Sequence, residues 1–151
     1  MKLKLKKQTS KTIMMGMILL FFSCKTYTIS VDSFREQMIN AKKEDMKEVK
    51  INNPLSYTNI KYASNNIERI KALDKSGKDV YLDNSPSIEL RITRRDNKKY
   101  FLYFDTVILE NDTLKGGESR FIQGLTNQIP MDDILKIEIQ DGKKDFKYKK
   151  N

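Results

Sequence analysis

The chain has 151 residues and a mass of 17.7 kDa, and 29 basic residues against 20 acidic ones give it a formal net charge of +9. A chain of this length forms one domain by default. The absence of His excludes Ser-His-Asp and Cys-His catalysis and HExxH zinc sites, and the single Cys excludes an intrachain disulfide and a CxxC pair.

The first 23 residues have the pattern of a secretory signal peptide. Five lysines and no acidic residue lie within residues 1–11, and the run IMMGMILLFF at 13–22 is uncharged and nearly all apolar. A basic segment followed by an apolar run of this length is typical of an export signal. As a helix the run would rise only ~15 Å against a hydrocarbon core of ~30 Å, so we do not expect a permanent membrane span.

Cys24 is the expected point of attachment to a membrane. Ordinary signal peptidase prefers a small residue at the third position before the cut, where this chain has Phe21. The stretch LFFSC at 20–24 resembles a bacterial lipobox, and its Phe-rich form is similar to that of small lipoproteins of Bacteroidota-type bacteria. The resemblance implies that Cys24 becomes the lipid-modified first residue of the mature chain. The alternative is a buried or free Cys behind a conventionally cleaved signal.

The charge of the remaining chain argues against nucleic acid as a partner. The signal segment carries five of the basic residues and none of the acidic ones, and residues 24–142 hold 19 of each sign. By the same resemblance, Lys25 instead of an acidic residue after the cysteine implies an outer-membrane lipoprotein that faces the periplasm. Acidic residues associated with surface export are missing, and the cell surface is the alternative location. We expect the membrane and an envelope protein, anionic glycan or lipid as partners.

One amphipathic helix is predicted near the start of the mature chain. An alternating strand or extended lead-in precedes it at Tyr27, Ile29 and Val31. Ser33 and Glu36 fit a capping box. Apolar residues then recur at helical spacing at Phe34, Met38 and Ala41 and, more weakly, at Met46 and Val49. Asn52-Asn53-Pro54 is expected to end the helix. We expect it to pack on a sheet, and a partner-binding helix near the lipid anchor is the alternative.

Short strands separated by turns are predicted for the rest of the chain. The predicted strands are 57–62, 67–73, 80–82, 88–93, 100–109, 121–125 and the segment around Ile137 and Ile139. The predicted turns are 74–78 with Gly77 at positive φ, 83–86, 96–97, 111–112 and a bend or bulge at Gly116-Gly117. Ile129-Pro130 is expected to lead into one helical turn at 131–134.

Two hairpins have a predicted register. A two-residue turn at Asp96-Asn97 would set Ile92 opposite Phe101 and Leu90 opposite Tyr103. A loop at 141–144 would set Ile139 opposite Phe146, Ile137 opposite Tyr148 and Glu138 opposite Lys147. The run YFLYFDTVIL at 100–109 is apolar on both faces over much of its length, and this is typical of a central strand.

These elements predict an α+β domain at 24–142, with one N-terminal helix packed on a mostly antiparallel sheet. Residues 143–151 form a Lys-rich C-terminal strand or tail. The succession of short strands, an Ile-Pro, one helical turn and a closing strand over 88–148 resembles SH3-like small barrels of some bacterial lipoproteins. Such a barrel is one form that the sheet could take.

Candidate sites for chemistry are few. Gly116 to Arg120 (GGESR) could present amides and a guanidinium to an anion, but the segment lacks the ending of a phosphate loop, so a structural turn is favoured. The carboxylates that could act in catalysis are Asp105, Glu110, Asp112, Asp132 and Asp133. Their spacing fits neither an EF-hand nor a glycosidase pair, and positions at strand ends and turns explain them better.

Basic residues gather at one predicted hairpin, beside aromatic ones: Arg91, Arg94, Arg95, Lys98 and Lys99. Charges of this kind protect exposed hairpins from pairing with other chains, and contact with an anion or an acidic partner is the sharper alternative. We expect no catalytic residue, no metal and no cofactor. The sequence favours a binding or structural accessory protein of the cell envelope, and a carboxylate-dependent envelope hydrolase is the alternative.

Overall fold

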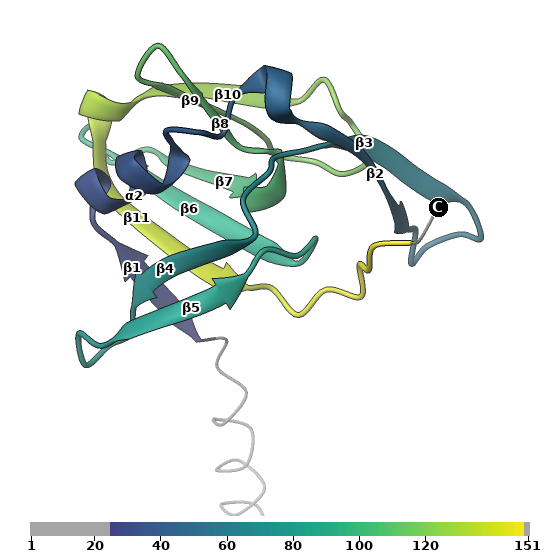
Figure 1. Ribbon diagram of the computed structural model, residues 1–151, viewed down its shortest axis with the longest axis horizontal. Helices are drawn as coiled ribbons and strands as arrows, with labels where there is room; N and C mark the ends of the chain where they lie inside the picture. The colour runs from purple at the N-terminus through teal and green to yellow at the C-terminus, as the bar shows by residue number, and fades with distance from the viewer. Residues whose placement is uncertain (1–24, 150–151) are drawn as a thin grey trace, which may run out of the picture.

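The strands within residues 25–149 form three antiparallel sheets (Figure 1). A computed structural model describes residues 25–149, so Cys24 and the predicted signal peptide lie outside the described residues. The largest sheet has the order β5 (Asp79–Asp83), β4 (Arg69–Leu73), β1 (Thr26–Ile29), β11 (Ile134–Asp141), β6 (Ile88–Arg94) and β7 (Lys99–Tyr103). The second sheet has the order β10 (Thr126–Pro130), β9 (Thr113–Gly117) and β8 (Ile108–Glu110). The third is a two-stranded ribbon of β2 (Lys47–Asn52) and β3 (Asn59–Ser64).

The predicted combination of one helix with a mostly antiparallel sheet is confirmed. The helix α2 (Val31–Met38) is the one α-helix of residues 25–149, and three short 3-10 helices lie at Lys43–Asp45, Phe104–Thr106 and Met131–Asp133. The SH3-like form is not confirmed, because the strands in this part of the chain form three open sheets and no closed barrel. No helix among these residues is long and apolar enough to cross a membrane.

The main core lies between α2 and the six-stranded sheet. Alternate residues of β6 and β11 point to the same face and are fully buried: Leu90, Ile92, Ile137 and Ile139. Phe34 and Met38 of α2 are also fully buried and belong to the same apolar cluster. The strict alternation in the sequence of β6 therefore produces one apolar face, and it belongs to a core that α2 shares with Leu114 and Ile129 of the second sheet.

The helix is shorter than predicted and begins three residues earlier. Its cap is Ser30, whose hydroxyl accepts a hydrogen bond from the Ser33 amide at 3.2 Å. The expected continuation through Met46 and Val49 is wrong, because Val49 and Ile51 belong to the strand β2. Their alternate spacing allows Ile51 to be buried against the ribbon's own small cluster. The alternate spacing of Val49 and Ile51 therefore predicts the structure of this segment better than the weak helical spacing of Met46 and Val49.

The predicted register of the β6–β7 hairpin is wrong by one residue. Leu90 pairs with Leu102 and Ile92 with Tyr100. Asn97 alone adopts a left-handed conformation in this turn, with φ of 64°, and the Asn97 amide donates to the Arg94 carbonyl at 2.9 Å. This turn has one more residue than a two-residue loop, as in hairpins that close with a left-handed residue. The shift buries Leu102 and leaves the Phe101 side chain 51% exposed.

The apolar run at 100–109 is not one central strand. It divides into β7, the 3-10 helix Phe104–Thr106 and β8, and β7 lies at the edge of its sheet. Phe104 and Val107 are both buried in the main core. A spacing of three suits a 3-10 turn and not an extended strand. The run is apolar on both faces because it connects two sheets that share this core.

The C-terminal segment joins a different sheet from the one predicted. β11 already has β1 on one side and β6 on the other, so it cannot form a hairpin with the residues that follow. The chain crosses instead to the ribbon, where Tyr148 pairs with Ile51 and Phe146 joins the cluster of Ile51 and Tyr62. The predicted strand at 121–125 is also wrong. This segment is a loop with exposed side chains, including Phe121 and Ile122.

Candidate functional site

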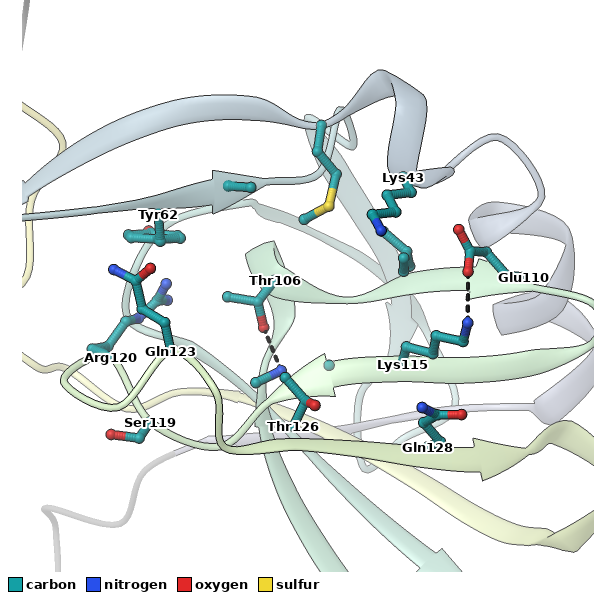
Figure 2. A pocket seen from close by; sticks show the side chains of 15 residues that line it. Lys43, Tyr62, Thr106, Glu110, Lys115, Ser119, Arg120, Gln123, Thr126 and Gln128 are labelled. Atoms are coloured by element: carbon teal, nitrogen blue, oxygen red, sulfur yellow. Dashed lines mark hydrogen bonds and ion pairs between the residues drawn. The ribbon is translucent and has the colours of Figure 1, made fainter.

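A cleft lies between the ribbon and the β8–β9–β10 sheet (Figure 2). Its volume is about 430 Å³, within the range of small-ligand sites. One end is polar and carries Lys43, Glu110, Lys115 and Gln128, and the other end carries Tyr62, Ser119, Arg120 and Gln123. Thr106 and Thr126 lie between these ends, and the lining also includes the apolar side chains of Met46, Ala63 and Ile108. The cleft therefore has the form of an elongated site with polar groups at both ends.

Arg120 closes one end of the cleft and is almost completely buried, with 2% of its surface exposed. Its guanidinium lies over the Tyr103 ring at 4.1 Å and the Tyr62 ring at 4.5 Å. Nη2 donates to the Pro86 carbonyl at 2.8 Å and lies 2.6 Å from Asp105 Oδ1, an ionic contact that is not aligned as a hydrogen bond. Nε and Nη1 are buried without a hydrogen-bond partner. Arg120 thus lines the cleft and holds two donor atoms for which the protein supplies no partner, and buried donors without partners are costly.

Asp105 is the counter-charge of Arg120 and is fully buried. Its Oδ2 accepts hydrogen bonds from the Tyr62 hydroxyl at 2.5 Å and from the Tyr148 hydroxyl at 2.9 Å. Burial, followed by the nearby Asp105 charge, raises the pKa of Tyr148 to about 12 and raises that of Tyr62 further. Both tyrosines therefore remain protonated donors at neutral pH. The network links the C-terminal segment, the ribbon and the end of the cleft.

The opposite end of the cleft carries an excess of positive charge. Lys115 Nζ donates to Glu110 Oε2 at 2.7 Å, and this hydrogen bond lowers the pKa of Glu110. Lys43 lies on the same wall. Three cationic side chains line the cleft against the single carboxylate of Glu110, with Asp105 behind Arg120. The electrostatics therefore favour a ligand with negative charge or many acceptor atoms.

The candidate segment from Gly116 to Arg120 does reach the cleft, but not as a loop that binds anions through its backbone. Gly116 and Gly117 belong to β9, so the predicted bend or bulge is wrong. A Cβ on Gly116 would lie 2.8 Å from Val107 Cγ2, so glycine allows the strand to pack closely on the core. The Gly117 amide donates to Thr106 Oγ1 at 2.9 Å. Four residues of this segment line the cleft, Gly116, Gly117, Ser119 and Arg120, and Arg120 supplies the positive charge.

The basic hairpin is not one cationic patch. Arg94 Nη2 donates to Asp133 Oδ2 at 2.8 Å, and Arg95 Nε donates to the Asp132 carbonyl at 2.7 Å. Lys98 Nζ lies 3.6 Å from Asp96 Oδ2, and the Arg91 guanidinium lies over the Phe101 ring at 5.0 Å. Lys99 is exposed at the start of β7. Neighbouring carboxylates and a ring thus engage most of these cations, and the five residues remain a less favourable anion site than the cleft.

The other predicted carboxylates are paired with basic side chains. Arg35 donates to Asp112 Oδ1 at 2.8 Å and to Asp132 Oδ1 at 3.3 Å, and Asp133 pairs with Arg94. Within residues 25–149 no group of three or more acidic or Cys side chains could hold a metal ion. The cleft itself is lined by one carboxylate, that of Glu110. This arrangement does not bring two carboxylates together around a substrate site.

Sequence reasoning missed Tyr62, Gln123 and Lys43 as parts of a site and treated Asp105 and Arg120 separately. One signal could have found the pair. Asp105 is the single charged residue in the apolar run at 100–109, and a charge buried in such a run needs a partner. Lys43 and Gln123 carry no local signal, because only the tertiary fold brings them to the cleft. Comparison of the chain with protein-family models, curated proteins and solved structures found no significant match.

Proposed function

We propose that this chain is a lipid-anchored accessory protein of the cell envelope that binds a ligand in the cleft beside Arg120. The observation that carries the binding role is the buried guanidinium at the end of the cleft, with Nε and Nη1 unpartnered. The lipobox-like stretch that ends at Cys24 supports the anchor. Several acyl chains are needed for firm attachment, because a single one binds membranes only marginally. An outer-membrane position facing the periplasm is part of this proposal.

The charge pairing in the cleft favours binding over hydrolysis. A carboxylate-dependent hydrolase needs one carboxyl group as an acid and a second as a base or nucleophile at the same bond. Glu110 is held as an ion pair by Lys115, and Asp105 is covered by two tyrosines and Arg120. The hydrogen bond from Lys115 lowers the pKa of Glu110, whereas a general acid at neutral pH needs a raised one. The cleft therefore supports a receptor or assembly role.

Metabolic labelling with a fatty-acid analogue tests the anchor. We expect label on the wild-type chain and none on Cys24→Ala, which removes the acceptor thiol. Ser23→Ala is the matched control, since it changes the preceding residue and keeps both the thiol and a small side chain before it. An unlabelled wild type, or label that survives Cys24→Ala, would contradict the anchor.

Affinity capture from detergent-solubilised envelopes tests the ligand site. The variant Thr126→Trp places a large side chain on an exposed position of the cleft wall, and we expect it to abolish recovery of the bound partner. Thr58→Trp adds the same side chain to an exposed position of the β2–β3 turn, outside the cleft lining, and should leave recovery unchanged. Equal recovery with both variants would show that the cleft is not the binding site.

A further inference from the structure

We infer that the cleft binds an extended acidic peptide segment, which adds a strand to the free edge of β3. The inference rests on the proposed binding role of the cleft and names the chemistry of its ligand. Peptides bind exposed sheet edges through main-chain hydrogen bonds, while their side chains enter neighbouring pockets. Three observations on the ribbon and the cleft carry this inference.

The first observation is the direction of the backbone groups in β3. Lys50 pairs with Lys61 across the ribbon, and the Lys50 carbonyl accepts from Lys149 on the far side. In an antiparallel pair the amide and carbonyl of one residue point to the same side. Lys61 therefore directs its groups away from β2 as well, and Ala63, two residues further along, does the same. Ala63 lines the cleft, and no other strand among residues 25–149 pairs with this edge of β3.

The second observation is that the opposite edge of the same ribbon already accepts an added segment. The Asn52 amide donates to the Lys147 carbonyl at 3.2 Å, and the Lys149 amide donates to the Lys50 carbonyl at 2.8 Å. Tyr148 forms a bridge with Ile51 between these two bonds. The C-terminal segment thus adds to β2 as an extended strand would. The ribbon therefore has two edges of extended backbone. The edge of β2 pairs with the C-terminal segment, and the edge of β3 faces the cleft.

The third observation is the side-chain amide of Gln123, which donates a hydrogen bond to the Lys61 carbonyl. A primary amide has the same donor chemistry as a peptide group. It occupies the point where the amide of an incoming strand would pair. Gln123 is exposed and lies in the loop at 118–125 between β9 and β10, so it can give way to a ligand without disturbing the core.

The charge of the cleft selects an acidic segment. Lys43, Lys115 and Arg120 line it, while Glu110 is the lining carboxylate. Lys115 shares its charge with Glu110, but Arg120 retains two donor atoms without partners. In a peptide strand paired with the edge of β3, alternate side chains would point into the cleft. The net positive charge of the lining would attract Asp or Glu at those positions and repel Lys or Arg.

A displayed library of random heptapeptides, selected on the full-length chain, tests the inference. We expect the selected sequences to be enriched in Asp and Glu, and a synthetic peptide with the consensus sequence to protect the Lys61 and Ala63 amides from hydrogen exchange. Ala63→Pro removes one outward amide without removing a bond to β2, and we expect it to weaken binding roughly tenfold or more. Lys43→Gln combined with Lys115→Gln should weaken binding and reduce its salt dependence.

Glu48→Pro is the matched control. Glu48 pairs with Ala63 and directs its amide to the other edge of the ribbon, so the change has the same backbone effect away from the cleft. We expect it to leave peptide binding unchanged. If Ala63→Pro does not fold, the exchange pattern of the wild-type chain decides.

Four results would overturn the inference: no enrichment, enrichment of basic or apolar peptides, protection away from β3, or equal binding by Ala63→Pro and wild type. A dimer whose β3 edges are protected without peptide would also overturn it, because the edge would then bind a second copy of the chain. Capture of a partner that Thr126→Trp abolishes and Thr58→Trp retains would still support the cleft as a binding site, so failure of the peptide ligand is distinguishable from failure of the proposed binding role.

Discussion

The six-stranded sheet and the ribbon are stabilised in different ways. The sheet shares an extensive apolar core with α2, whereas the cluster of the ribbon consists of Ile51, Tyr62 and Phe146. Beside that small cluster, Asp105 and Arg120 are buried as an ion pair, and Tyr62 and the half-exposed Tyr148 donate hydrogen bonds to Asp105. Apolar burial is non-directional, but a buried ion pair with hydrogen bonds has one favourable geometry. The position of the ribbon thus depends on polar contacts. Because the ribbon forms one wall of the cleft, the shape of the cleft depends on the same contacts.

The largest expected effect is the loss of the buried charge pair. Arg120→Leu leaves the Asp105 carboxyl group buried without its counter-charge, which should lower the free energy of unfolding by about 3–5 kcal/mol. Chemical denaturation measures this effect. The double variant Asp105→Asn/Arg120→Leu should recover part of the loss, because it removes both charges. A loss below about 1 kcal/mol for the single variant would mean that apolar packing also holds the ribbon.

A change in the main core should cost slightly less. Leu90 is fully buried between α2 and the sheet, and Leu90→Ala should lower the free energy of unfolding by about 3 kcal/mol through lost burial and a cavity. Denaturation of Leu135→Ala provides the control, since Leu135 is 55% exposed on β11. Comparable losses at the two positions would contradict the location of the core.

A smaller and local effect is expected at Tyr148. Tyr148→Phe removes one hydrogen bond to Asp105 and should cost about 1 kcal/mol. Hydrogen exchange should accelerate at the Lys149 amide, which bonds to Lys50, more than at amides between β6 and β11. Tyr57→Phe, at a fully exposed position, should change neither. Uniform acceleration across all sheets would mean that the segment is not attached independently.

The smallest effect is a pH dependence at the alkaline end. The pKa of Tyr148 is raised to about 12, chiefly by burial, so the folded state favours the protonated phenol. Its stabilising contribution is therefore complete below the unfolded pKa of about 10 and is lost as pH rises through the folded value. The ultraviolet absorbance of tyrosinate should show a late step near pH 12 that Tyr148→Phe removes. An unchanged titration curve would contradict the buried contact.

Local patterns predicted the elements better than their pairing. The alternation of Ile88, Leu90 and Ile92 predicts β6 and its buried face, and the turn at 74–78 has Gly77 at φ of 81° as expected. Both features depend on neighbouring residues. The β6–β7 register depended on which residue of the turn became left-handed, and Asn97 alone did so. A difference of one residue in a turn reverses the faces of the following strand.

The candidate site could be predicted only in part, because it is assembled from distant segments. Arg120 was recognised as a possible anion ligand, and Asp105 stands out as a charge within an apolar run. Their pairing depends on the 3-10 turn at Phe104–Thr106, which the apolar run concealed. The ribbon that forms one wall of the cleft also packs against the C-terminal segment, which crosses to β2 instead of returning along β11. Local periodicity contains no information on that crossing.

The position of β1 has a consequence for how the domain would stand on a bilayer. Thr26 begins the strand two residues after Cys24 and pairs with Gln140. Two extended residues reach only ~7 Å, about the depth of one headgroup layer. A lipid on Cys24 would therefore be joined to β1 by a very short linker, which would keep this end of the sheet close to the membrane surface. The turn at Asn97 lies at the far end of β6, about 20 Å away, so a lipid on Cys24 would leave this turn on the side of the domain away from the membrane.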